Sequence, residues 1–117
     1  MKKAAVNLLA AACLMGCHSH VSPPPRPQGV PTDAIWAGGS DGGSFIRCEF
    51  DPSSAMDFCS VFNDHTGQLD AQGKYEVSGK SKPQDVARFE YSGFDGHHIY
   101  LRDGSVLTPV GGAKTSP

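Results

Sequence analysis

The sequence predicts an all-β domain, a small antiparallel sheet, sandwich or barrel of six to seven strands with one disulfide. Three observations support this fold class. Short runs of β-branched and aromatic residues alternate apolar and polar positions. Clusters of Gly, Asp, Ser and Pro, which are turn formers, separate these runs. No long stretch shows a convincing helical period. This pattern extends over residues 30–110, which we expect to form the folded domain.

Residues 1–16 have the pattern of a secretory signal peptide. Lys2 and Lys3 precede an apolar core that runs from Ala4 to Met15, and small residues follow. This core is too short for a permanent transmembrane helix, which needs about 20 apolar residues. We therefore expect export of the chain and removal of residues 1–16.

The segment "LMGC", which ends at Cys17, resembles the lipobox of bacterial lipoproteins. The resemblance implies that diacylglycerol is attached to Cys17, that cleavage occurs before it, and that the freed amine is acylated, typically by palmitate. Several acyl chains on one residue make a stable membrane anchor, because a single chain binds only reversibly. Position 18 is His and not the Asp that retains lipoproteins in the inner membrane of enteric bacteria. We therefore expect the outer membrane, with the domain facing the periplasm.

Residues 17–29 comprise the expected lipidated cysteine and a proline-rich spacer. The stretch "HSHVSPPPRPQG" has four prolines and no apolar period. Such a segment favours extended polyproline II, which rises about 3.1 Å per residue. The alternative is a P-x-x-P ligand for a partner. At the other end of the chain, residues 111–117 are expected to form a flexible tail.

The charge of the chain after cleavage excludes one class of partner. Loss of Lys2 and Lys3 would leave 8 basic and 12 acidic residues, a net charge near −4. A mildly acidic chain without a basic cluster is a poor nucleic-acid binder. It also lacks the polybasic segment that contacts anionic lipid head groups. We predict no nucleic-acid partner and no cofactor.

The expected strands follow one another between turn signals. "SFIRCEF" and "DFCSVFN" flank a loop opened by Asp51-Pro52, and "GKYEVS" follows the loops "DHTG" and "DAQG". "ARFEYSGF", "HHIYL" and "SVLTPV" are separated by Asp95-Gly96 and Asp103-Gly104, and Asp-Gly between alternating runs is a strong hairpin signal. The one weak helical candidate, "SKPQDVARF", is broken early by Pro83, so we predict no helix there.

Cys48 and Cys59 are predicted to form a disulfide, because an exported protein meets an oxidising compartment. The hairpin register that places Cys48 opposite Cys59 also places Ile46 opposite Val61 and gathers apolar side chains on one face. Ten residues separate the two cysteines. A reactive redox pair is usually spaced C-x-x-C, so this spacing indicates a structural bridge.

The aromatic residues leave two interpretations open. Phe45, Phe58 and Phe62 are expected on the face of the first hairpin opposite the cysteines, with Phe45 facing Phe62. Tyr91 and Tyr100 are expected to pair across the Asp-Gly hairpin between them. Either other strands cover the aromatic face, or it is an exposed patch that docks a partner or glycan. We favour the first interpretation.

The stretch "GGSDGGS" contains a literal match to a hydrolase motif. Gly38, Ser40 and Gly42 satisfy G-x-S-x-G, the nucleophile elbow of α/β-hydrolases. That motif requires a strand-turn-helix on a parallel sheet, whereas a strand follows here. We interpret the stretch as a turn and rank a small hydrolase third among the possible functions. "GKS" at 79–81 is likewise no phosphate-binding loop, because Pro83 prevents a following helix.

The histidines do not predict a metal site. His97 and His98 are adjacent on an expected strand, so their side chains would point to opposite faces. His65, Asp64 and Asp95 could approach one of them in space, but the spacing does not match that of known ligand sets. We expect solvent-exposed histidines and no bound metal.

The segment "WAGGSDGGSFIRC…FCSVFNDHTGQLDAQGKYEV" resembles an uncharacterised family of small bacterial proteins. The family is marked by a Trp-x-Gly-Gly-x-Asp-Gly-Gly block, two cysteines and an Asn-Asp-x-Thr-Gly turn. The resemblance implies no activity. The matching positions are Trp36, Gly38, Gly39, Asp41, Gly42, Gly43, Cys48, Cys59, Asn63, Asp64, Thr66 and Gly67.

The expected function is that of a lipid-anchored envelope lipoprotein, a non-enzymatic binding or structural module with no catalytic residue. The alternative is an inhibitor of a cell-wall hydrolase. The loop "SGKSK" shares Ser78, Gly79 and a nearby base with the Ser-Gly-x-x-Tyr loop of periplasmic lysozyme inhibitors, which are small disulfide-containing β-barrels, but it lacks the tyrosine. Ser78, Lys80 and Lys82 are the candidate contacts with a partner in the envelope or cell wall.

Overall fold

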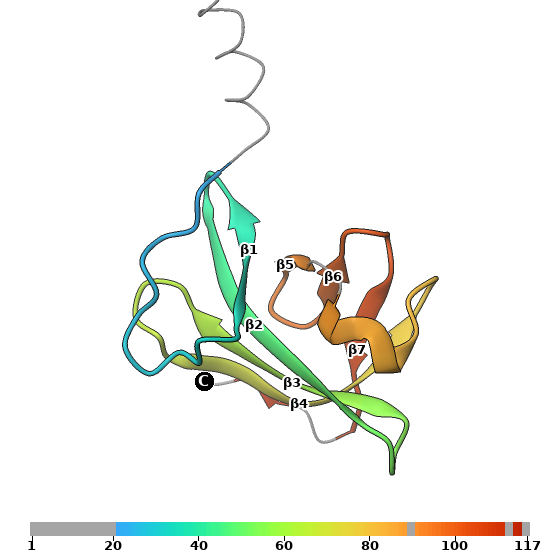
Figure 1. The fold of residues 1–117 in the computed structure, drawn as a ribbon. Coiled ribbons are helices and arrows are strands. Elements are labelled where there is room, and N and C mark those ends of the chain that lie inside the picture. Colours follow the sequence, from blue (N-terminus) through green and yellow to red (C-terminus); the bar gives the residue numbers. More distant parts are fainter. Residues whose placement is uncertain (1–20, 89–90, 112–113, 116–117) are drawn as a thin grey trace, which may run out of the picture.

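The computed structural model describes residues 21–88, 91–111 and 114–115 (Figure 1). The expected signal peptide and lipidation site, residues 1–17, lie outside the described residues. No helix in the described part of the chain is long and apolar enough to cross a bilayer. The strands of the described residues are β1 Ile35–Gly39, β2 Gly42–Asp51, β3 Met56–Asn63, β4 Leu69–Ser78, β5 Tyr91–Phe94, β6 Ile99–Leu101, β7 Val106–Pro109 and β8 Lys114–Thr115.

These strands form one antiparallel sheet in the order β1-β2-β3-β4-β7-β6-β5, with β8 paired to β4. The sheet curls so that its two end strands, β1 and β5, come into contact, which gives a nearly closed barrel. The predicted all-β class is therefore confirmed, in its barrel form. The pairing of β8 with Ala71 and Gln72 places residues 114–115, part of the predicted tail, against the sheet.

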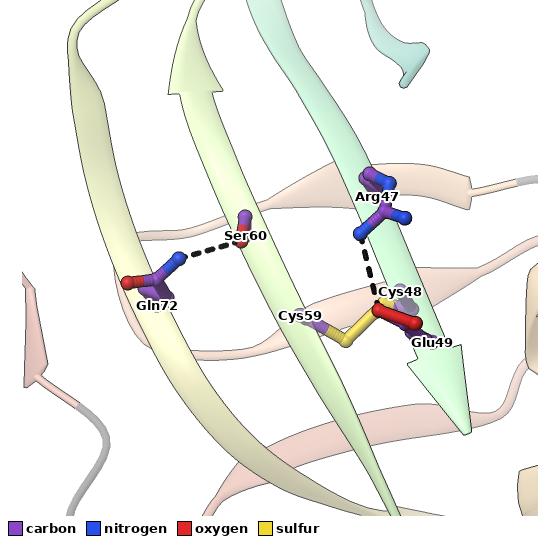
Figure 2. The surroundings of a disulfide bond; sticks show 6 residues. All are labelled: Arg47, Cys48, Glu49, Cys59, Ser60 and Gln72. Atoms are coloured by element: carbon purple, nitrogen blue, oxygen red, sulfur yellow. Dashed lines mark hydrogen bonds and ion pairs between the residues drawn. A yellow bond between two sulfur atoms is a disulfide. The ribbon is translucent and has the colours of Figure 1, made fainter. Parts of the chain in front are cut away.

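The hairpin of β2 and β3 has the register predicted from the sequence. Cys48 lies opposite Cys59 and forms a disulfide with it, and Ile46 lies opposite Val61. Figure 2 shows the bridge joining the two strands, with Arg47 directed toward Glu49. Because side chains alternate along a strand, this register decides which side chains of both strands enter the barrel.

The interior of the barrel is the main hydrophobic core. It contains the disulfide and buried apolar residues of every strand from β1 to β7 and of the segment between β4 and β5. A fully buried Val, Leu or Ile side chain contributes about 1.5–3 kcal/mol. The members of this cluster are Ala37, Ile46, Cys48, Cys59, Val61, Ala71, Tyr75, Val86, Tyr91, Ile99, Leu101 and Leu107.

A second, smaller core covers the outer face of the first hairpin. Phe45 is buried there against Val30 and Ala34, and Trp36 and Phe62 pack against this group. The cover therefore comes mainly from the chain just before β1 and from β1 itself. The aromatic face around Phe45 is thus covered by other parts of the chain and is not an exposed patch. Phe58 is the exception and remains 37% exposed.

No α-helix forms around Pro83, as predicted, but the segment is not irregular either. Residues Pro83–Arg88 form a short 3-10 helix, η1, which buries Val86 completely in the core. Proline is tolerated in the first turn of a helix because its missing N–H has no partner there. Pro83 therefore begins this helix instead of breaking it.

One turn prediction was correct only at its centre, and another was wrong. The glycine-rich stretch mostly lies in strands, and only Ser40 and Asp41 link β1 to β2. "DAQG" lies inside β4, where Ala71 is buried opposite Val61. In both places the sequence carries turn-forming residues, but pairing with a neighbouring strand satisfies the backbone better than a turn would.

Tyr91 and Tyr100 do not pair with each other. An irregularity in β5 shifts the register, so that Tyr91 lies opposite Leu101 and Tyr100 lies opposite Gly93. An extra residue in one strand turns the following side chains to the other face. Tyr91 is consequently buried in the core, whereas Tyr100 is exposed.

The disulfide is expected to supply a large part of the stability of this small domain. Replacing both Cys48 and Cys59 by Ala should lower the free energy of unfolding by about 3 kcal/mol, because the bridge closes a short loop in the unfolded chain. Guanidinium denaturation of the folded domain measures this change. Wild-type protein unfolded in the presence of a reductant should match the double variant. A loss below about 1 kcal/mol would contradict the prediction.

Candidate functional site

A cleft of about 380 Å³ opens at the end of the barrel where β1 turns into β2 and β3 turns into β4. Trp36 lines it from β1, Asp41 from the β1–β2 turn, and Asp64 and His65 from the β3–β4 turn. Residues of the segment before β1 line it as well. Its volume lies within the range of about 300–1,000 Å³ that is common for small-molecule pockets.

The glycines of the β1–β2 hairpin allow the ring of Trp36 to lie along the strand. Gly38 and Gly43 face each other, and a Cβ built on Gly38 would lie 2.6 Å from the Cα of Gly43 and 2.8 Å from Cζ2 of Trp36. Any side chain at either glycine would push the two strands or the indole ring away. The glycine block is therefore needed for a close approach between strands, and not for a flexible turn.

The carboxylate of Asp64 fixes the indole ring. Its Oδ2 accepts one hydrogen bond from Nε1 of Trp36, at 3.0 Å, and a second from the backbone N–H of Gly43, at 2.9 Å. The side chain of Asp64 is buried, and its residue is only 6% exposed. Hydrogen bonds to a charged acceptor are the stronger kind, so this carboxylate ties the β3–β4 turn to the β1–β2 hairpin.

Asn63 shapes the turn that presents Asp64 and His65. Its Oδ1 accepts hydrogen bonds from the backbone N–H groups of His65, at 2.8 Å, and Thr66, at 2.9 Å. Gly67 closes the turn by donating its N–H to the carbonyl of Asn63. This is the local pattern by which asparagine favours turns over continued strand.

The proline-rich segment is fastened to the barrel beside the cleft. One guanidinium nitrogen of Arg26 donates to the carbonyls of Pro31, at 2.8 Å, and Ala34, at 2.9 Å, and the group lies 4.9 Å from the ring centroid of Phe45. Pro27 lies close to Gly67, where an added Cβ would meet it at 3.0 Å. Part of the segment that we expected to be a spacer therefore belongs to the folded structure.

Ser40 and His65 line the same cleft, so we asked whether they form a catalytic pair. A nucleophilic serine needs a base within about 3.2 Å. Among the described residues no hydrogen bond joins the side chains of Ser40 and His65. Ser40 also lies in a two-residue turn between antiparallel strands, which lacks the strand-turn-helix of a nucleophile elbow.

The candidate loop Ser78–Lys82 lies at the other end of β4 from the cleft (Figure 1). Ser81 is buried and holds this loop: its N–H donates to Oγ of Ser105, at 2.9 Å, and its hydroxyl donates to Asp103, at 2.6 Å. The hydrogen bond from Ser81 lowers the pKa of the Asp103 carboxyl. Lys80 and Lys82 are exposed on either side of Ser81.

The histidines 97 and 98 lie in a turn and not, as predicted, on a strand. Their backbone N–H groups donate to Oδ1 of Asp95, and their rings meet edge to face with centroids 4.6 Å apart. The hydroxyl of Tyr100 donates to Oδ2 of Asp95 at 2.6 Å, and this bond is the main cause that lowers the pKa of that carboxyl. No group of three or more His, Cys, Asp or Glu residues in the described chain is arranged to hold a metal.

Asp57 is a buried acid that the sequence analysis did not single out. It is 1% exposed on the inner face of β3, and neither of its carboxylate oxygens has a hydrogen-bond partner. Burial raises its pKa to about 6. Tyr75 lies opposite it on β4. The pKa of Tyr91 is raised to about 12, mainly by burial and further by the charge of Asp57.

A signal for Asp57 was present in the sequence. Asp57 lies two residues before Cys59, so the predicted register already placed it on the inner face. The pairing of Trp36 with Asp64 had no such signal, because they are 28 positions apart in the sequence and only the folded barrel brings them together. Comparisons of the chain with protein-family models, with curated proteins and with solved structures found no match.

Asp57 should make the stability of the domain depend on pH. Its carboxyl ionises at about 6 in the folded state and near 3.9 in the unfolded chain. Well below pH 4 the Asp57 carboxyl is protonated in both states and does not lower the free energy of unfolding. Between about pH 4 and pH 6 the carboxyl ionises in the unfolded chain but stays protonated in the folded state, so stability falls by on the order of 2–3 kcal/mol and stays at that lower level above pH 6.

The variant Asp57→Asn should remove this dependence, so its stability relative to wild type should be higher at pH 8 than at pH 4 by that amount. Denaturant unfolding at a series of pH values measures the difference. Asp41→Asn, which neutralises an exposed carboxyl, controls for the loss of one charge. Parallel pH profiles for wild type and Asp57→Asn would show that the buried carboxyl is not the cause.

Proposed function

We propose that this protein is a lipid-anchored, non-enzymatic binding module of the cell envelope, and that the cleft around Trp36 is its binding surface. The observation that carries the proposal is the fixed position of Trp36 in that cleft, where its indole N–H is held by the buried carboxylate of Asp64. A side chain that is already immobilised loses little conformational entropy when a ligand binds.

The chemistry of the cleft supports binding over catalysis. The carboxylate of Asp64 already accepts two hydrogen bonds that hold the fold together. Among the described residues, Ser40 has no hydrogen bond to a base. Preformed concave sites with an aromatic wall and a few polar groups are typical of ligand-binding surfaces. The remaining part of the proposal, the anchor at Cys17, comes from the lipobox-like sequence that precedes the described chain.

The anchor is tested with the full-length chain expressed in a bacterium that processes lipoproteins. Wild-type protein should be found in the membrane fraction, with an intact mass that lacks residues 1–16 and includes acyl chains. The variant Cys17→Ala should leave the membrane fraction. Cys13→Ala, which changes a cysteine of the expected signal, is the matched control and should behave as wild type. An unacylated wild-type chain that retains residues 1–16 would overturn this part of the proposal.

A second candidate function is inhibition of a cell-wall hydrolase by the loop Ser78–Lys82. The observation that favours it is the anchoring of this loop at Ser81, which leaves Lys80 and Lys82 exposed on a rigid support. A loop that is held in one shape can enter a target's cleft at low entropic cost. Two lysines there would contact acidic groups of a hydrolase active site.

The inhibitor function predicts a loss of inhibition on changing the two lysines. Purified protein should block cleavage of bacterial cell walls by lysozyme, and the double variant Lys80→Ala/Lys82→Ala should weaken this by about tenfold or more. A variant with Lys74→Ala, an exposed lysine on the barrel wall, should inhibit like wild type. If wild-type protein does not slow lysozyme at all, this second candidate function is wrong. The first proposal, a binding module, is not affected by that result.

A further inference from the structure

We propose that the cleft binds a neutral sugar ring of a glycan, which packs against Trp36 and Pro24. This inference rests on the proposed binding function and names the chemical class of its ligand. Trp36 comes from β1 and Pro24 from the segment before it, so two separate parts of the chain supply the apolar walls.

The shape of a sugar ring matches these walls. A pyranose has C–H groups on its flat faces and hydroxyl groups around its edge. The indole of Trp36 and the ring of Pro24 offer flat apolar surfaces, and both side chains are only partly buried in the free protein. Aromatic side chains with a fixed orientation supply large contact area at small entropic cost.

The charges of the cleft favour a neutral ligand over an anionic one. Asp41 and Asp64 line it, and no lysine or arginine of the described chain does. An anionic ligand would face two carboxylates, and among the described lining residues only the imidazole of His65 can carry a positive charge. The carboxylate of Asp41 is exposed in the β1–β2 turn and has a free capacity to accept hydrogen bonds from sugar hydroxyls.

The segment that carries Pro24 is fastened at one end. Arg26 holds it through two hydrogen bonds and its contact with Phe45. For residues 21–25 the structure records no hydrogen bond to the barrel. A polyproline segment is stiff but has no internal hydrogen bonds. The contacts of Arg26 therefore set where Pro24 stands in the cleft wall, so Arg26 is part of the site.

The experiment uses the folded protein and the neutral oligosaccharide triacetylchitotriose. Trp36 is the only tryptophan, so its fluorescence reports on the cleft alone. Wild type should show saturable binding at millimolar sugar or below, confirmed by calorimetry. Pro24→Gly and Arg26→Ala should each bind about tenfold more weakly, since both loosen the same wall. Phe58→Ala, which removes an exposed aromatic on the opposite part of the barrel, should bind as wild type does.

Trp36→Phe keeps an aromatic ring and the packing but loses the bond to Asp64, and its binding, measured by calorimetry, should also weaken. Absence of sugar binding by folded wild-type protein would overturn the inference, and membrane association through Cys17 would remain as a separate result. Tighter binding of trilysine than of the sugar would also overturn it and would identify a cationic peptide as the ligand. Unchanged binding in both Pro24→Gly and Arg26→Ala would overturn the role of the proline-rich wall.

Discussion

The disulfide between Cys48 and Cys59 is the constraint on which the rest of this structure depends. It joins directly opposite residues of β2 and β3 and therefore admits one register for the hairpin. A slip by one residue would place Ile46 opposite Ser60 or Phe62, so with β3 unchanged Ile46 would turn to the outside and Phe45 to the inside. The core of a small domain gives limited stability. The covalent bond, which fixes the register, adds stability that a larger domain would obtain from a larger core.

The same register builds the cleft. Ser44 lies opposite Asn63 at the end of the hairpin, so the next residues, Gly43 and Asp64, come within hydrogen-bonding distance. Asp64 then reaches Trp36 on β1. The register also points Phe45 to the outer face of the hairpin, where the segment from Arg26 to Ala34 buries it. The binding surface and the proline-rich wall thus follow from one pairing of strands.

The buried carboxylate of Asp57 is also a consequence of this register. It lies two residues from Cys59 and is carried into the barrel with the disulfide. A buried carboxylate without a partner destabilises the folded state when it is ionised. The disulfide contributes stability of the same order as this cost, so the domain can retain the acid at neutral pH.

Much of the fold could be predicted from the sequence, because alternation and cysteine pairing are local signals that act along one hairpin. They gave the all-β class, the disulfide and the inner face of β2 and β3. Strand β1 was missed because its pairing depends on glycines, which the sequence alone marks as turn formers. The register of Tyr91 was missed because an irregular strand leaves no local signal.

The candidate site was less predictable than the fold. Its components were visible as separate motifs, a tryptophan before a glycine block and an Asn-Asp turn, but no local rule joins them. Arg26 lies in a stretch whose composition indicates an extended spacer. Only the folded barrel shows that this arginine packs on Phe45 and lies beside the cleft.

The most direct test of this account is the hydrogen exchange of the Trp36 indole N–H, followed by NMR in oxidised and reduced protein. Trp36 is the only tryptophan, so one indole resonance reports on its bond to Asp64. The account predicts slow exchange with the disulfide intact and faster exchange after reduction, because the register that aligns Asp64 is then no longer locked. Rapid exchange in the oxidised protein, or equal protection in both states, would contradict it.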